Sequence, residues 1–267
     1  MTQMELAGGK ILASAENGVG RVVFNQPEKR NAMSVDMWSG MGEALDRFAE
    51  DPSVRCVVLQ GAGDKAFVSG ADISQFEQNR ADASAQMEYD RLTSAGRAKL
   101  STYGKPVVAQ IRGFCMGGGL GIAMSADIRI ASDDSQFGIP AARLGIAYGF
   151  DMVRALVGLV GPAHAHMILM TGDRFAAAEA ERMGLVNKVV PVADLDATVA
   201  KLAATMAGNA PLSLGTNKLT VKAVLRDRED RDMAALRDAM AACFNSADYR
   251  EGRRAFMEKR RPAFTGA

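Results

Sequence analysis

The chain has 267 residues, of which 48% are hydrophobic and 24% are charged, enough apolar side chains for one large core. Its 32 basic residues balance 31 acidic residues, so no overall field favours binding to nucleic acid or to an anionic membrane. We find no run of about 18 to 20 apolar residues and no signal peptide, which predicts a cytoplasmic protein without a membrane span.

The cysteines and histidines give little sign of a disulfide framework or a metal centre. Cys56, Cys115 and Cys243 are an odd number at wide spacing, so neither a set of disulfides nor a CxxC metal site is expected. Only His164 and His166 are available as imidazole ligands, so a zinc site of the usual kind is not predicted.

Strands and helices alternate in the first part of the chain. Residues 10–16 and 20–25 carry the β-branched apolar runs of strands, residues 34–51 have helical spacing, and residues 54–63 return to strand. Ser34 is expected to be the N-cap of the helix, with Asp36 in its first turn. This order favours an α/β sheet.

The remaining elements divide the chain into two parts. Residues around 77–103 are expected to be helical and partly exposed, residues 105–113 and 127–132 to be strands, and residues 120–127 to be a helix. From Asp151 onward nearly everything predicts helix, except residues 186–191. We therefore expect an α/β core over residues 1–200 and a C-terminal helical region over residues 201–267.

Two glycine-containing turns connect a predicted strand to a predicted helix. Gly117 to Gly121 form a cluster of four glycines, and Gly70-Ala71-Asp72 form the second turn. Such turns present backbone N–H groups at the positive end of a helix, where an anion binds well. The cluster matches neither a Walker loop nor a GxGxxG motif. Either turn alone is most simply a structural connection, but two together favour an anion-binding site.

Cys115 offers an alternative interpretation. The spacing Gly113-x-Cys115-x-Gly117 resembles a nucleophile elbow with cysteine in place of serine, and His164 follows later in the chain. A thiol hydrolase is therefore one hypothesis. The other is that Cys115 is a small buried apolar residue beside a tight turn.

Several motifs occur together in the order typical of the crotonase (enoyl-CoA hydratase/isomerase) family. They are NQPEKRNAMS, KAFVSGADI, KPVVAQIRGFCMGGGLGIAMSADIRIAS, FGIPAARLG, MTGDRFAAAEAERMGLVNKVVP and REGRRAFMEKRRP. The chain resembles this family over nearly its whole length. The resemblance implies an α/β fold, a spiral of ββα units, with a C-terminal helical region that mediates homotrimers, often paired into hexamers.

The resemblance also implies a substrate and the residues that bind it. The substrate would be an acyl-CoA thioester, with coenzyme A as part of the substrate and no tightly bound cofactor. Its carbonyl oxygen would accept hydrogen bonds from the backbone N–H groups of Ala71 and Gly118, an oxyanion hole. The expected coenzyme A contacts are Lys29, Arg30, Asp72, Ile73, Ser74, Phe256 and Lys259. In relatives the last two positions sometimes reach a neighbouring subunit's site, although the basic C-terminal segment is equally well a solvated helix face.

The sequence departs from the hydratase pattern at two positions. Hydratases of this family carry glutamates where this chain has Gly121 and Ala141, and neither residue can transfer a proton. Tyr148 matches a tyrosine of malonyl-type CoA decarboxylases in the family and is our first candidate for a catalytic polar group. Asp151 is the second, although a first-turn carboxylate paired with Arg154 is its ordinary interpretation.

The sequence thus predicts an acyl-CoA enzyme that works through an oxyanion-hole-stabilised enolate. The reaction is left open among isomerisation, decarboxylation and an atypical hydration. A malonyl-type CoA decarboxylase and a weakly catalytic acyl-CoA-binding protein are the alternatives. Arg143 is a further candidate, as the partner of a substrate carboxylate.

Overall fold

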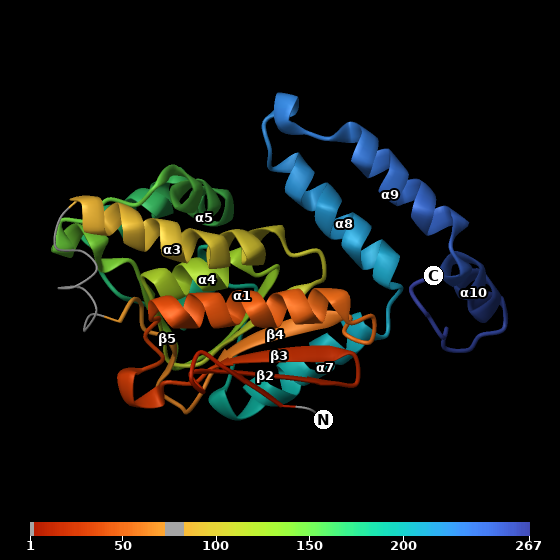
Figure 1. The fold of residues 1–267 in the computed structure, drawn as a ribbon, viewed down its shortest axis with the longest axis horizontal. Helices are drawn as coiled ribbons and strands as arrows, with labels where there is room; N and C mark the ends of the chain where they lie inside the picture. The colour runs from red at the N-terminus through yellow and green to blue at the C-terminus, as the bar shows by residue number, and fades with distance from the viewer. Residues whose placement is uncertain (1–2, 73–82) are drawn as a thin grey trace.

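The computed structural model describes residues 3–72 and 83–267, which form two sheets covered by helices (Figure 1). The larger sheet has the strand order β1-β2-β3-β4-β6-β8-β11 and the smaller one the order β10-β9-β7-β5. The strands are β1 (Met4–Leu6), β2 (Ile11–Glu16), β3 (Val19–Phe24), β4 (Cys56–Gly61), β5 (Ala66–Val68), β6 (Val107–Ile111), β7 (Phe114–Met116), β8 (Ile128–Ser132), β9 (Gln136–Gly138), β10 (Phe175–Ala176) and β11 (Lys188–Val190).

The helices cover both faces of the larger sheet and continue into a C-terminal arm. The α-helices are α1 (Val35–Glu50), α3 (Ala83–Thr102), α4 (Gly118–Ser125), α5 (Phe150–Thr171), α6 (Ala177–Arg182), α7 (Leu195–Ala207), α8 (Pro211–Val224), α9 (Met233–Asn245) and α10 (Ala247–Met257). Short 3-10 helices are η1 (Pro27–Lys29), η3 (Pro140–Leu144), η4 (Val192–Asp194) and η5 (Arg228–Asp230).

Consecutive strands alternate between the two sheets. β4, β6 and β8 belong to the larger sheet, and the strand that follows each of them, β5, β7 or β9, belongs to the smaller one. The next α-helices in the chain are α3, α4 and α5, respectively. This repeat is the arrangement of ββα units that the motifs imply. The short strands β7, β9 and β10 were not predicted, because two or three residues show no periodicity.

Alternating side chains of the larger sheet enter two different apolar clusters. In β4, Val57 and Leu59 face the main core, whereas Cys56 and Val58 pack in a second cluster against α7. Val199 and Ala203 of α7 belong to that second cluster. The predicted boundary between residues 200 and 201 therefore falls inside a helix that packs on the sheet, and the arm begins with α8.

The start of α1 differs in detail from the expectation. Ser34 is the N-cap residue, but its side chain accepts no hydrogen bond from the helix and instead donates to the Asp36 carboxylate. The Asp36 carboxylate accepts from the Met37 N–H at 3.1 Å and pairs with Lys10 Nζ at 2.8 Å. Asp36 therefore supplies the carboxylate at the positive end of this helix.

Helix α5 is a longer apolar helix than any expected from the sequence. Its 22 residues are long and apolar enough to pass for a membrane span by length and composition, although no such segment was predicted. However, the backbone at Gly161 has φ 73° and ψ 168°, which divides the helix before Pro162 into two shorter segments. Leu156, Val160 and Ala165 are buried in the core. Each half is too short to span a bilayer, which takes about 20 residues.

Helices α8 to α10 extend from the body as an arm (Figure 1). Lys218 of α8 is buried and donates from Nζ to the Asp127 carboxylate at 2.7 Å and to the Lys105 carbonyl at 2.8 Å. Arg55 in the body donates to the backbone carbonyls of Ala207 and Phe264 at 3.1 and 2.5 Å. The Lys218 contacts hold α8 to the body, and the Arg55 bond to Phe264 holds the segment that follows α10.

Candidate active site

The predicted site lies where three neighbouring strands of the smaller sheet end. β7 pairs in parallel with both β5 and β9, so the carboxyl ends of these strands lie at one edge of the sheet. Ala71 follows β5, Gly118 follows β7 and Ala141 follows β9. Ligands of α/β proteins commonly bind outside the carboxyl ends of parallel strands.

The first turn is held in an extended conformation by Met33. The Met33 N–H donates to the Gly70 carbonyl at 2.8 Å, and the Asp72 N–H donates to the Met33 carbonyl at 2.9 Å. Ala71 lies between these two bonds as the partner of Met33 in an isolated parallel bridge. Because backbone groups of successive extended residues point to opposite sides, the Ala71 N–H points away from Met33.

The second turn ends β7 and begins α4. Gly117 has φ 51° and ψ −118°, a conformation that favours glycine, and its N–H donates to the Gly138 carbonyl at 2.9 Å. Gly118 is the first residue of α4, where a backbone N–H has no acceptor within the helix. The positive end of the helix dipole lies at the same place.

The two turns lie directly against each other. A methyl group built on Gly117 would lie 3.9 Å from Gly70 Cα, and one built on Gly70 would lie 3.6 Å from the Met116 carbonyl oxygen. At Gly119 a methyl group would lie only 2.1 Å from the Val68 carbonyl oxygen, so α4 packs closely on the end of β5. The structure thus brings the predicted oxyanion-hole turns together.

Tyr148 lies beside these turns, whereas Asp151 is farther along at the start of α5. A methyl group built on Gly117 would lie 3.6 Å from the Tyr148 hydroxyl oxygen, and the Tyr148 side chain packs partly buried against the core. Asp151 is exposed in the first turn of α5. Its expected partner Arg154 instead pairs with Asp227 at 3.6 Å, so that pairing was wrong.

Arg143, the predicted partner of a substrate carboxylate, binds protein groups instead. The exposed guanidinium of Arg143 forms an ion pair with Asp173 and donates to the Thr171 carbonyl at 3.3 Å. Both partners lie beyond the end of α5 or in its last turn. Arg143 is therefore held at the side of η3 by protein groups.

A methionine takes the space where the family pattern has a glutamate. Gly121 is buried in α4, and a methyl group built on it would lie 2.5 Å from Met152 Cε and 3.2 Å from Met152 Sδ. Ala141 is 7% exposed in η3, with its carbonyl accepting from the Ile146 N–H at 3.0 Å. Met152 fills the space of a side chain at position 121, Ala141 belongs to the main core, and Met152 was not among the residues predicted from the sequence.

The residues expected to contact coenzyme A are only partly brought together. Lys29 Nζ donates to the buried Asp72 carboxylate at 2.8 Å, so these two lie together next to Ala71. Arg30 turns away, with its guanidinium carbon 5.2 Å from the centre of the Phe114 ring. Ile73 and Ser74 lie outside the described residues.

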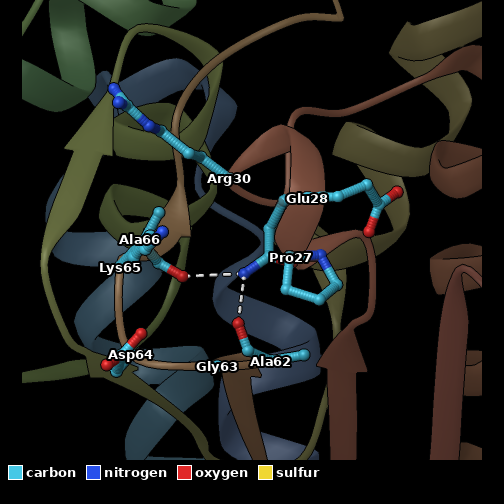
Figure 2. A pocket seen from close by; sticks show the side chains of 9 residues that line it. Pro27, Glu28, Arg30, Ala62, Gly63, Asp64, Lys65 and Ala66 are labelled. Atoms are coloured by element: carbon cyan, nitrogen blue, oxygen red, sulfur yellow. Dashed lines mark hydrogen bonds between the residues drawn. The ribbon is translucent and has the colours of Figure 1, made fainter.

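Asn31, which the sequence analysis did not identify, fixes the loop that carries Lys29. It is completely buried with φ 56°, and its Nδ2 donates to the Ala62 and Ala66 carbonyls at 2.9 and 2.7 Å. Asn31, Ala62 and Ala66 line a cavity of about 260 Å³, and the dashed lines in Figure 2 mark these two bonds. Asn31 Oδ1 accepts from the Gln26 N–H at 3.0 Å. Three hydrogen bonds thus set the loop that leads to Met33.

Phe256 and Lys259 lie away from the other predicted site residues. Phe256 belongs to α10 and is 82% exposed, and Lys259 follows it in a left-handed conformation with φ 53°. In Figure 1, α10 lies at the opposite end of the molecule from β5 and α4. Within one chain, therefore, these two side chains do not approach the strand ends.

Cys115 does not have the surroundings of a nucleophile. It is completely buried in β7, and burial raises the pKa of its thiol far above the ordinary value. Nδ1 of His164 lies 3.1 Å from the Val160 carbonyl of its own helix. Both observations contradict the thiol hydrolase alternative.

Comparisons with known proteins agree with the motifs. A model of the enoyl-CoA hydratase/isomerase family matches residues 14–267. A crotonyl-CoA hydratase of Syntrophomonas wolfei is 36% identical, covering 97% of this chain and 99% of the relative. A short-chain-enoyl-CoA hydratase of Clostridium acetobutylicum is also 36% identical, over 97% of each.

The fold is matched as closely. A solved structure described as an enoyl-CoA hydratase/carnithine racemase from Magnetospirillum magneticum is 34% identical, with a TM-score of 0.92. The match covers 97% of this chain and 96% of that one. The mixed α/β fold and the resemblance are both confirmed, and the chain belongs to the enoyl-CoA hydratase/isomerase (crotonase) family.

Proposed function

We propose that the protein binds the carbonyl oxygen of an acyl-CoA thioester with the N–H groups of Ala71 and Gly118 and stabilises the enolate formed from it. The proposal rests on the contact between the two turns. A β-carbon on Gly117 would lie 3.9 Å from Gly70 Cα, and each of these glycines precedes one of the two N–H donors. Preorganised donors act on charge that develops in the transition state, and one donor typically contributes about 2.7 to 4 kcal/mol. Family membership supports the CoA thioester as substrate.

The reaction depends on which group moves a proton. Hydration of a 2-enoyl thioester needs one group to activate water and another to protonate Cα. Gly121 and Ala141 provide neither, although the relatives described above are named hydratases. We propose that Tyr148 is the proton-transferring group, supported by its hydroxyl beside Gly117. Asp151 stays a second candidate, exposed at the start of α5.

Decarboxylation is the second reaction that this arrangement favours. When a malonyl-type CoA loses CO₂, the electron pair of the broken C–C bond forms the enolate directly. The oxyanion hole then holds the enolate oxygen, and one proton delivered to Cα completes the reaction. A single donor such as the Tyr148 hydroxyl suffices for this sequence, whereas hydration needs two roles.

Coenzyme A is proposed to lie over the loop that carries Lys29. The ammonium of Lys29 is 2.8 Å from Asp72 and is close enough to the first turn to meet a phosphate of the cofactor portion. Phe256 and Lys259 would then contact it from a neighbouring subunit of a homotrimer or hexamer. We also propose a cytoplasmic location, which the free thiols of Cys56 and Cys115 favour.

One assay separates the proposed reactions. The protein is incubated with crotonyl-CoA, a 3-enoyl-CoA and methylmalonyl-CoA, and the products are identified by mass spectrometry. Conversion of the 3-enoyl-CoA indicates isomerisation, and release of propionyl-CoA indicates decarboxylation. Rapid hydration of crotonyl-CoA would contradict the argument from Gly121 and Ala141. Tight binding of all three without turnover would indicate the weakly catalytic acyl-CoA-binding protein.

The role of Tyr148 is tested with the substrate that turns over fastest. Tyr148→Phe should lower kcat by about 100-fold or more, because it removes the proton donor and keeps the ring. Asp151→Asn tests the second candidate in the same way, because it removes the ionisable group and keeps the size of the side chain. If Tyr148→Phe retains full turnover and Asp151→Asn does not, the proton passes through Asp151.

A further inference from the structure

Met152 and Gly121 share one volume beside the oxyanion hole. A β-carbon added to Gly121 would lie 2.5 Å from the terminal methyl carbon of Met152 and 3.2 Å from its sulfur. Such separations are far below van der Waals contact, so any side chain at position 121 must displace Met152. The Met152 thioether can therefore take this position only because residue 121 is glycine.

This shared volume lies close to the carbonyl-binding N–H of Gly118. Gly121 is three residues after Gly118 in α4, which places both on one side of the helix, about 5 Å apart along its axis. A thioester oxygen that accepts from the Gly118 N–H would therefore lie about one helical turn from Gly121. Met152 is only partly buried, so part of its side chain stays accessible to a ligand.

The neighbouring groups make this part of the site apolar. Ile146 and Met152 both pack, partly buried, against the main core, and Ala141 is 7% exposed in η3. Methionine is flexible and polarisable, and it fills irregular space next to apolar ligands. The Tyr148 hydroxyl adjoins the second turn, 3.6 Å from the position of a methyl group on Gly117.

We propose that Met152 is the specificity-determining residue for the acyl group. This inference rests on the proposed acyl-CoA function and deepens it. The thioether fills the space beside Gly121, so the site selects a compact acyl chain, and a side chain at position 121 would fit only if Met152 moved. Met152 thus sets the acyl size.

Binding measurements with saturated thioesters test the size selection without any turnover. Isothermal titration calorimetry with acetyl-, butyryl- and hexanoyl-CoA is performed on the wild-type protein, Met152→Ala and Met152→Leu. Removal of the thioether should shift the affinity ratio of hexanoyl-CoA to butyryl-CoA by about tenfold in favour of the longer chain. Met152→Leu keeps most of the volume and should give a smaller shift. Met170→Ala, at a methionine of α5 that is 72% exposed, should leave the ratio unchanged.

The outcomes distinguish the two proposals. If the wild-type protein binds no acyl-CoA, the proposed function fails and this inference fails with it. If it binds acyl-CoA but the Met152 variants keep the wild-type ratio, this inference alone is overturned.

A double-mutant cycle tests the shared volume independently of any ligand. Gly121→Glu should lower the unfolding midpoint, and Met152→Ala in the same chain should restore part of that loss because the thioether no longer obstructs residue 121. Strictly additive effects of the two substitutions would overturn the claim that they compete for one space.

Discussion

The backbone N–H of Gly118 can be removed without removing the residue's helical conformation. Gly118 is the first residue of α4, where proline is well tolerated because the N–H has no helical acceptor. Gly118→Pro should therefore fold with a near-normal unfolding midpoint and lower kcat by about 100-fold to 1000-fold, the cost typical of one lost oxyanion donor. Turnover of the preferred thioester and thermal unfolding are the measurements.

Gly118→Ala is the control for this substitution. It keeps the N–H, and its β-carbon would meet no heavy atom of the described residues within 4 Å. Alanine should therefore reduce turnover much less than proline does. Equal losses in the two variants would mean that the size of residue 118, rather than its hydrogen bond, limits the reaction.

Neighbouring glycines of the same cluster have different physical requirements. Gly119 has no space for a β-carbon because of the Val68 carbonyl, whereas a β-carbon on Gly121 would require the end of the Met152 side chain to move. Gly118, by contrast, opens to the site. The sequence could predict the cluster and its exposed N–H groups, but not these differences, because each depends on a residue roughly 30 or 50 positions away in the chain.

At the scale of elements, the loop from Pro27 to Met33 is held by the buried amide of Asn31. Asn31→Asp would replace the Nδ2 donor by an oxygen facing the Ala62 and Ala66 carbonyls, and two acceptors would lose their donor. The free energy of unfolding should fall by about 2 kcal/mol or more, the cost of buried unsatisfied polar groups. Urea unfolding followed by circular dichroism measures the change.

Asn17 provides a matched control for Asn31. It has nearly the same backbone conformation, φ 52°, but is exposed in the turn between β2 and β3. Asn17→Asp should change the free energy of unfolding by less than about 0.5 kcal/mol. Similar losses at both positions would attribute the effect to the backbone conformation and not to the buried hydrogen bonds.

The elements that position the site are those the sequence predicts least well. The long helix α1 and the strand β4 follow from their apolar spacing, and both are close to the predicted ranges. The site, however, depends on β7 and β9, which have three residues each and take their conformation from pairing with neighbours. Family motifs could predict Ala71 and Gly118, whereas Asn31 and Met152 become recognisable only through contacts between distant segments.

Lys222 of α8 should make stability depend on pH. Its Nζ donates to the Ser101 and Tyr103 carbonyls, and burial, followed by the charge of Lys218, lowers its pKa from 10.5 to about 8. Between these values the unfolded chain binds more protons than the folded chain, so the free energy of unfolding contributed by Lys222 rises as pH increases. Because the side chain is partly solvated, we expect a rise of only about 1 kcal/mol.

A comparison with Lys222→Met isolates this contribution. Chemical unfolding of both proteins is measured from about pH 7 to about pH 10, and the wild-type value minus the variant value is plotted. Subtraction removes groups that titrate in both proteins, including Cys56, whose pKa burial raises to about 11. A difference that stays flat or falls across this range would contradict the buried docking of Lys222.

For the whole molecule, the arm carries apolar side chains that one chain leaves uncovered. Val221 and Val224 on α8 and the C-cap residue Leu225 are 61 to 65% exposed, and Met240 and Phe244, one turn apart on α9, are 51 and 60% exposed. Such stripes favour self-association. We expect sedimentation equilibrium to give three or six times the 28.3 kDa chain mass.

Charges introduced into the α8 stripe should dissociate this assembly. Val224→Asp combined with Leu225→Lys places ionised groups in a surface that must be desolvated, whereas Lys201→Asp changes an exposed side chain on α7 and should have no effect. The dissociated variant should also bind coenzyme A more weakly, because α10, which carries Phe256 and is followed by Lys259, lies far from β5 and α4 of its own chain (Figure 1). Undiminished affinity in a monomer would show that neither side chain contacts coenzyme A from a neighbouring subunit.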